Sequence, residues 1–232
     1  MTSWLIRVAA VAVLLALPGA GAARGPAKPS AWPAAAKPAP RATPKVRITP
    51  ITCTAPVGRL DSAKALRRRF GEAALVRITP GDEGAQEFVV VLNPQDSARR
   101  IEVIYPDAAM RAPLRLRIDR LSSTWSVAGL RVGEGLAAVT ARNGGGFALR
   151  GFGTGEGGRV TGWSGGALAT LPGGCTLGVR FVAPQTEQVA AAANGSERNL
   201  RSDQAEVVAA EPIVAELSMG WAPAPPPARR RK

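Results

Sequence analysis

Proline-rich segments at both ends limit the part of this chain that can fold. Residues 25–44 and 222–232 consist mainly of proline, alanine and basic residues, and they hold few large apolar side chains for a core. We expect extended spacers, a basic linker over residues 23–45 and a basic tail over residues 222–232. Folding is thereby confined to residues 46–221, enough for one domain or two small ones.

The first 22 residues have the pattern of a secretory signal peptide. A short basic start precedes the uninterrupted apolar run of residues 8–17, and Ala20-Gly21-Ala22 supplies the small residues that a signal peptidase needs. An uncleaved membrane anchor is the alternative, but the run is shorter than the about 20 residues that cross a bilayer core. We predict cleavage near Ala22 or Ala23 and a periplasmic or secreted protein without a membrane span.

The formal net charge of +13 is concentrated at the two ends of the chain. Residues 46–221 are nearly balanced, with 20 basic and 17 acidic residues. Flexible basic ends attract polyanions without specificity, and a folded nucleic-acid-binding face would need its own excess of positive charge. The predicted partners therefore include polyanions in general but no specific nucleic acid.

The first half of the body, residues 50–120, has the pattern of a helix followed by an antiparallel meander. Asp61 or Ser62 can cap a helix, Leu66 and Phe70 fall on one face of it, and Gly71 can end it. Segments rich in β-branched or alternating apolar residues follow, separated by turn sequences. We predict strands at Ala74–Ile78, Glu87–Leu92, Arg100–Tyr105 and Leu114–Ile118.

The second half, residues 121–221, repeats this order more weakly. Glu134–Arg142 has a helical pattern, and a shift of 73 residues places Leu66 on Val139 and Gly71 on Gly144. We expect an α+β fold of two tandem helix-plus-antiparallel-meander units. The other elements predicted here are strands at Phe147–Phe152, Arg159–Trp163 and Thr176–Val182, a loop at Thr186–Asn199, a helix at Ser202–Ala210 and a strand at Ile213–Trp221.

The spacing of glycine and tryptophan in the second half carries a resemblance. The segments Leu130-Arg131-Val132-Gly133, Gly151-Phe152-Gly153 and Pro172-Gly173-Gly174-Cys175, together with Trp163, resemble an uncharacterised family of exported proteobacterial proteins over roughly residues 50–221. The tandem unit is more distantly similar to β-lactamase inhibitory protein and to a small outer-membrane assembly lipoprotein. The resemblance implies a location in the envelope and brings no activity with it.

Two glycine motifs do not have the context that their chemistry requires. Residues 153–158 match GxGxxG, but strand-forming residues follow where a dinucleotide site needs a helix N-terminus. Ser164 lies in a GxSxG motif, but the chain has no histidine and offers this serine no obvious base. We interpret both motifs as turns or bulges and predict no cofactor and no catalytic serine.

Cys53 and Cys175 are the only cysteines, one in each predicted half. An exported protein folds where thiols oxidise, so a single disulfide is the simplest interpretation. Two buried free thiols are the alternative, and a metal site would need further ligands.

The remaining candidates for function are acids and aromatic residues. We expect a non-enzymatic binding or envelope-assembly module with an envelope protein as partner. Phe152 and Trp163, which flank the glycine-rich segment, are candidate partner-binding residues, with packing in the core as the alternative. A cell-wall glycan hydrolase with a carboxylate pair and a structural envelope component are the other hypotheses. The acids considered for such a pair are Asp107, Asp119, Glu134 and Glu156.

Overall fold

The computed structural model describes residues 46–81, 85–153, 155–183, 193 and 195–221. The predicted signal peptide, linker and tail lie outside these residues, and so does much of the loop predicted at Thr186–Asn199. Within the described part of the chain, no helix is long and apolar enough to cross a bilayer.

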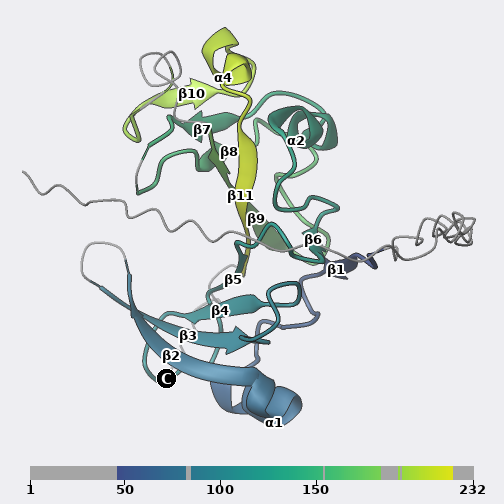
Figure 1. Ribbon diagram of the computed structural model, residues 1–232, viewed down its shortest axis with the longest axis vertical. Helices are drawn as coiled ribbons and strands as arrows, with labels where there is room; N and C mark the ends of the chain where they lie inside the picture. Colours follow the sequence, from purple (N-terminus) through teal and green to yellow (C-terminus); the bar gives the residue numbers. More distant parts are fainter. Residues whose placement is uncertain (1–45, 82–84, 154, 184–192, 194, 222–232) are drawn as a thin grey trace, which may run out of the picture. The chain divides into compact units, whose positions relative to one another are not determined.

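Six antiparallel strands form the main sheet in the order β2-β3-β4-β5-β11-β9 (Figure 1). Strand β11 is the last element of the described residues and pairs with β5 on one side and with the edge strand β9 on the other. The strands are β2 (Ala74–Pro80), β3 (Gln86–Leu92), β4 (Ile101–Tyr105), β5 (Arg115–Ile118), β9 (Cys175–Val182) and β11 (Ile213–Trp221).

Two smaller sheets accompany the main sheet. One has the order β10-β7-β8 and is antiparallel, and the other is the parallel pair β1-β6. Their strands are β1 (Thr49–Ile51), β6 (Trp125–Val127), β7 (Ala148–Arg150), β8 (Val160–Gly162) and β10 (Asn199–Arg201).

The helices are short and begin and end where local chemistry favours it. In α1 (Ala63–Phe70), the Ser62 side chain accepts a hydrogen bond from the Ala65 N–H, and Gly71 follows the last residue as predicted. The single 3₁₀ turn η1 (Gly71–Ala73) leads from it into β2. Helix α2 (Leu136–Asn143) ends at Gly144, whose φ of 79° is left-handed. The helix predicted at Ser202–Ala210 is confined to α4 (Ala205–Ala209).

The predicted α+β class is confirmed, whereas the tandem repeat of one unit is not. The first half forms α1 followed by the meander β2-β3-β4-β5, as expected. The strands of the second half are divided between sheets, because β7 and β8 join β10 while β9 and β11 extend the main sheet. Strand β11 therefore completes a sheet that the first half began.

The two faces of the main sheet have different environments. On one face, here called the core face, alternate residues pack with α1, α2 and the β7 strand into one buried apolar cluster. Leu66 of α1 and Val139 of α2 are fully buried in it. Members from the sheet include Val90, Val103, Leu116, Leu217 and Met219. The opposite face, here called the open face, points away from this core.

A disulfide joins Cys53, just after β1, to Cys175 at the start of β9, which confirms the predicted pairing. The two Cα atoms are 5.7 Å apart. Next to the bridge, the Trp221 Nε1–H donates to the Cys53 carbonyl oxygen at 2.9 Å. The bridge ties the first described segment to the far edge of the sheet, and it agrees with folding in an oxidising compartment.

Candidate functional site

Charged side chains gather on the open face of the main sheet. Strand β5 reads Arg-Leu-Arg-Ile, and its period of two places Leu116 and Ile118 in the core and Arg115 and Arg117 on the open face. Cross-strand neighbours share a face, so the register gathers the charges of the other strands beside them. The charged residues of this face are Arg77, Arg100, Arg115, Arg117, Arg159 and Arg180 with Glu87, Glu102 and Glu216.

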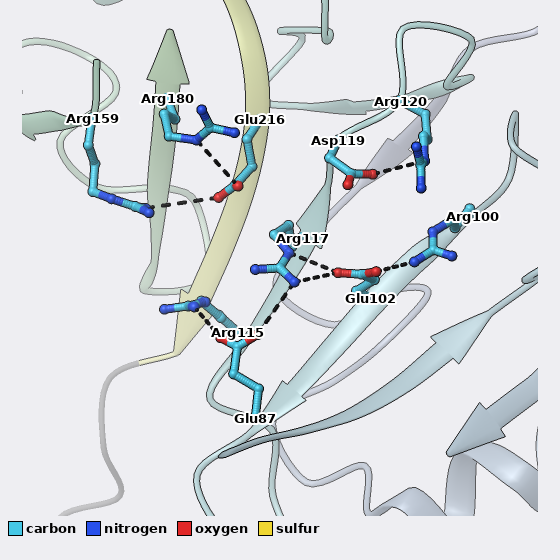
Figure 2. Close-up of polar contacts among 10 residues, drawn as sticks. All are labelled: Glu87, Arg100, Glu102, Arg115, Arg117, Asp119, Arg120, Arg159, Arg180 and Glu216. Atoms are coloured by element: carbon cyan, nitrogen blue, oxygen red, sulfur yellow. Dashed lines mark hydrogen bonds and ion pairs between the residues drawn. The ribbon is translucent and has the colours of Figure 1, made fainter. Parts of the chain in front are cut away.

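Glu102 of β4 and Glu87 of β3 hold one group of these arginines (Figure 2). Arg117 Nε and Nη2 donate to Glu102 Oε2 at 2.8 and 2.6 Å, and Arg100 contacts the other carboxylate oxygen. Arg115 Nη2 donates to Glu87 at 2.9 Å, with Arg117 Nη2 at 3.5 Å from its second oxygen. Each carboxylate is therefore shared between two guanidinium groups.

A second group lies at the β9 end of the open face. Figure 2 shows that the carboxylate of Glu216 in β11 contacts both Arg159 and Arg180. Its oxygens are 3.9 Å from Arg159 Nη1 and 3.6 Å from Arg180 Nε, which is longer than a direct hydrogen bond. Arg159 also contacts Glu156 at the margin of the face.

The arginine stems on the open face lie over a small apolar cluster. Val89, Val91 and Ile104 are almost fully buried there, apart from the main core. A cavity of about 300 Å³ opens beside them and is lined by residues that include Arg77, Arg100 and Glu102. Long arginine stems cover apolar surface while their charged ends reach water, so this side of the sheet needs no covering helix.

Two of the arginine groups in this cavity have unused hydrogen-bonding capacity. The Nε of Arg100 is buried and has no hydrogen-bond acceptor among the described residues. Arg77 is exposed and forms no ion pair with any residue that the structure describes. Arg77 can donate to an added acceptor without breaking an existing ion pair, whereas the Arg100 Nε is covered by its surroundings.

The carboxyl group of Glu102 is held in its charged form. Burial alone would raise its pKa, but the hydrogen bonds and positive charges of Arg117 and Arg100 outweigh burial and lower the pKa below its ordinary value. A general acid at neutral pH needs a raised pKa. Glu102 is therefore suited to hold arginines in place and unsuited to donate a proton.

Replacing Glu102 with glutamine should destabilise the protein by about 3 kcal/mol at neutral pH, since it leaves Arg117 and Arg100 partly buried without their counter-charge. Because folding lowers this pKa, the Glu102 contribution is complete above the unfolded pKa and is lost as the pH falls through the lower folded value. Urea unfolding of both proteins should show the difference shrinking below about pH 4.

Exposed Glu197 provides a matched control for this substitution. Glu197→Gln makes the same chemical change on the surface, and we expect an effect within about 0.5 kcal/mol. A Glu102→Gln effect no larger than this control would mean that the ion pairs on the open face do not contribute to stability.

Both predicted partner-binding residues are placed in the core. Phe152 is 1% exposed and Trp163 is 9% exposed. The Trp163 ring lies 5.3 Å from that of Phe147, and its Nε1–H donates to the Leu177 carbonyl oxygen at 3.2 Å. Their placement favours the packing alternative, so neither residue enters the proposed binding surface.

The glycine-rich segment beside these rings approaches backbone of the same chain. A Cβ atom on Gly158, whose φ is 74°, would overlap the carbonyl oxygen of Phe181 in β9. A Cβ atom on Gly151 would likewise overlap the carbonyl oxygen of Gly195. Glycine is needed here for internal packing, which agrees with the prediction of a turn or bulge and not a nucleotide site.

The GxSxG motif forms a turn. Ser164 has a φ of 52° and is exposed, and the Gly166 N–H donates to the Trp163 carbonyl oxygen at 2.9 Å to close the turn. Gly166 also leaves room for Asn143, a buried residue at the end of α2. The Asn143 side chain donates to the carbonyl oxygens of Trp163 and Gly145, so it joins the end of α2 to this turn.

The acids considered for a hydrolase have separate local surroundings. Asp107 accepts hydrogen bonds from the backbone of its own turn, Asp119 pairs with the adjacent Arg120, and Glu156 pairs with Arg159. Glu134 lies before α2, where its carbonyl oxygen accepts from the Val214 N–H. Among the residues that the structure describes, no group of three or more acids, cysteines or histidines could hold a metal ion.

Comparisons of the chain with protein-family models, curated proteins and solved structures find no match. The resemblance to exported proteobacterial proteins therefore stays a hypothesis. The class of protein is defined by the fold alone, a disulfide-linked α+β domain whose main sheet has one core face and one open, arginine-rich face.

Proposed function

We propose that this chain is an exported, non-enzymatic binding module of the bacterial envelope and that the open face is its binding surface. The observation that carries the proposal is the arrangement of arginines on one face of the sheet, with Arg77 exposed and without an ion pair among the described residues. Arginine is enriched among the residues that dominate protein interfaces. The signal-peptide pattern and the disulfide support the envelope location.

A protein with exposed carboxylates is the partner that fits this surface best. Glu87, Glu102 and Glu216 interrupt the positive charge at fixed places, so the face presents a pattern of both signs. Such a pattern favours one complementary protein surface and disfavours a uniform polyanion, which would meet these carboxylates. The predicted attraction of polyanions concerns the basic ends, outside the described residues.

The alternative of a glycan hydrolase finds less support. Glu87 and Glu102 share one cavity and Asp203 and Glu211 share another, and arginines lower the pKa of Glu102 and of Asp203. A glycosidase needs one carboxyl group that stays protonated near neutral pH.

Photo-crosslinking in the cell envelope tests the proposed surface. A photoreactive phenylalanine analogue at Thr79 or at Thr176 reports on opposite edges of the open face, and the exposed position Val208 in α4 is the control. We expect one discrete crosslinked product from both face positions and none from the control.

The same experiment is repeated with Arg180→Ala, which removes one arginine from the open face while Arg159 remains near Glu216. The product should decrease at least tenfold with little change in melting temperature, since removing a partly exposed surface charge has a small effect on stability. Products of equal yield from Val208, or no effect of Arg180→Ala, would contradict the proposal.

A further inference from the structure

Among the described residues, no strand pairs with the outer edge of β2, which lies beside α1 (Figure 1). A groove of about 710 Å³ runs between them, lined by Leu75 and Val76 of the strand and by Lys64, Arg67 and Arg68 of the helix. Unpaired strand edges are normally short, charged or covered, because they offer free backbone groups to another chain. This edge combines free backbone, apolar side chains and a basic wall.

The hydrogen bonds at both ends of the β2–β3 pair establish which backbone groups of β2 point outward. Just before β2, the Ala73 carbonyl oxygen accepts a hydrogen bond from the Asn93 N–H at 2.7 Å. Just after β2, the Gly81 N–H donates to the Ala85 carbonyl oxygen at 2.8 Å. Both pairs continue the β2–β3 register. Hydrogen-bonded pairs alternate in an antiparallel ladder, so the odd-numbered residues of β2 bond to β3 and the even-numbered ones face outward.

The outward-facing residues are Ala74, Val76, Ile78 and Pro80. The Ala74 N–H is already used by the Gly71 carbonyl oxygen, which agrees with its outward direction, and proline has no N–H. Within the described part of the chain, Val76 and Ile78 therefore hold the free donors of this edge. Their side chains are also accessible, at 38% and 60% exposed, although they belong to the core side of the sheet.

A second copy of this chain fits the edge poorly. The two-fold antiparallel register that uses both free donors pairs Val76 of each copy with Ile78 of the other and places Arg77 directly opposite Arg77. Like charges directly opposite in a sheet are destabilising. The basic helix residues beside the edge add to the repulsion, since Lys64, Arg67 and Arg68 form no ion pair among the described residues.

We infer that this edge binds an extended acidic segment of a partner protein, which adds to the main sheet as a further antiparallel strand. Its residues opposite Val76 and Ile78 would place apolar side chains on the core side, in and beside the groove. The residue between them lies opposite Arg77 and is expected to be acidic, with further acids near the basic residues of α1. The inference shares Arg77 with the proposed binding surface, whereas Val76, Ile78 and the basic residues of α1 belong to this edge alone.

Binding of blocked eight-residue peptides to the full chain tests this inference. The probe alternates valine and glutamate, and the control peptide alternates valine and lysine. We expect the acidic probe to bind at least tenfold more tightly, with an affinity that falls as salt is raised. Equal affinity for the two peptides, or no binding of the acidic one, would overturn the inference.

Backbone N-methylation of the acidic probe distinguishes strand addition from simple charge attraction. Residues directly opposite each other share a face, so the valines of the probe are expected to lie opposite Val76 and Ile78. These positions form the hydrogen-bonded pairs, so the valine amides should face β2 and the glutamate amides should face away. Methylating the valine amides should weaken binding at least tenfold, whereas methylating the glutamate amides should have little effect. The same loss from both modifications would contradict the assigned register.

Variants of the protein provide the reciprocal test. Ile78→Pro removes a free donor without removing a bond of the sheet, so peptide binding should fall at least tenfold while the far-ultraviolet circular dichroism is unchanged. Lys64→Glu with Arg68→Glu should have a similar effect, and Arg111→Glu, an exposed arginine outside the groove, should not. Arg180→Ala should leave peptide binding intact, which separates this site from the open face.

A dimer of this chain that Ile78→Pro dissociates would assign the edge to a second copy and overturn the inference.

Discussion

Loss of the Cys53–Cys175 bridge is expected to lower the free energy of unfolding by about 5 kcal/mol, following the chain-entropy relation for the 122 residues that it spans. The bridge holds the segment after β1 against the start of β9, where Trp221 also donates to the Cys53 backbone. Without the bridge, the unfolded chain has more conformations available, so folding loses more conformational entropy. Urea unfolding of the double variant Cys53→Ala with Cys175→Ala measures the difference at neutral pH.

Reductant supplies the control for the bridge. Adding reductant to the unmodified protein should reproduce most of the loss in the free energy of unfolding. Adding it to the double variant should leave this free energy unchanged. A protein whose unfolding midpoint is the same with and without reductant, although mass analysis shows the bridge to be intact beforehand, would contradict the expected contribution.

Trp163→Ala is expected to destabilise the protein by about 3 to 5 kcal/mol, the usual range for truncating a large aromatic residue in a core. The ring packs against Phe147, which also stacks on Phe181 with ring centroids 5.9 Å apart. Removing the indole therefore leaves a cavity between β9 and the β10-β7-β8 sheet. The substitution also leaves the Leu177 carbonyl oxygen without the indole donor. Denaturant unfolding measures the loss.

Trp163→Phe separates the two contributions. Phenylalanine keeps most of the packing on Phe147 and removes the indole N–H, so we expect a smaller loss of about 1 to 2 kcal/mol. A partner-binding role would be indicated by the opposite result, in which Trp163→Ala changes stability by less than about 1 kcal/mol and abolishes the crosslinks from the open face.

Local chemistry allowed much of the first half to be predicted. Ser62 and Gly71 bound α1 because a side-chain cap and a glycine stop act within a few residues of the chain. The meander strands were predicted for a similar reason, since alternation and turn residues are local signals. In the second half the prediction of a repeated unit was not confirmed, because strand partners are not local and β11 pairs with β5 across about a hundred residues.

The open face was missed although part of its pattern is visible in the sequence. The alternation of Arg115 and Arg117 with Leu116 and Ile118 indicates that both arginines share one face of a strand. Their acceptors Glu87 and Glu102 belong to other strands, and only the register brings them opposite. A contact between strands depends on pairing and offset, which residue spacing along one strand does not contain.

The sequence by itself determined the α+β class, the end of α1, the balanced charge of residues 46–221 and the pairing of the two cysteines. These follow from composition, from interactions between near neighbours, or from the lack of any other cysteine. Only the tertiary structure decided that Trp163 and Phe152 are buried, that the arginines meet on one face, and that no described strand pairs with the outer edge of β2. The physical reason is that burial, charge pairing and edge exposure depend on which distant segments pack together, and packing is a property of the whole fold.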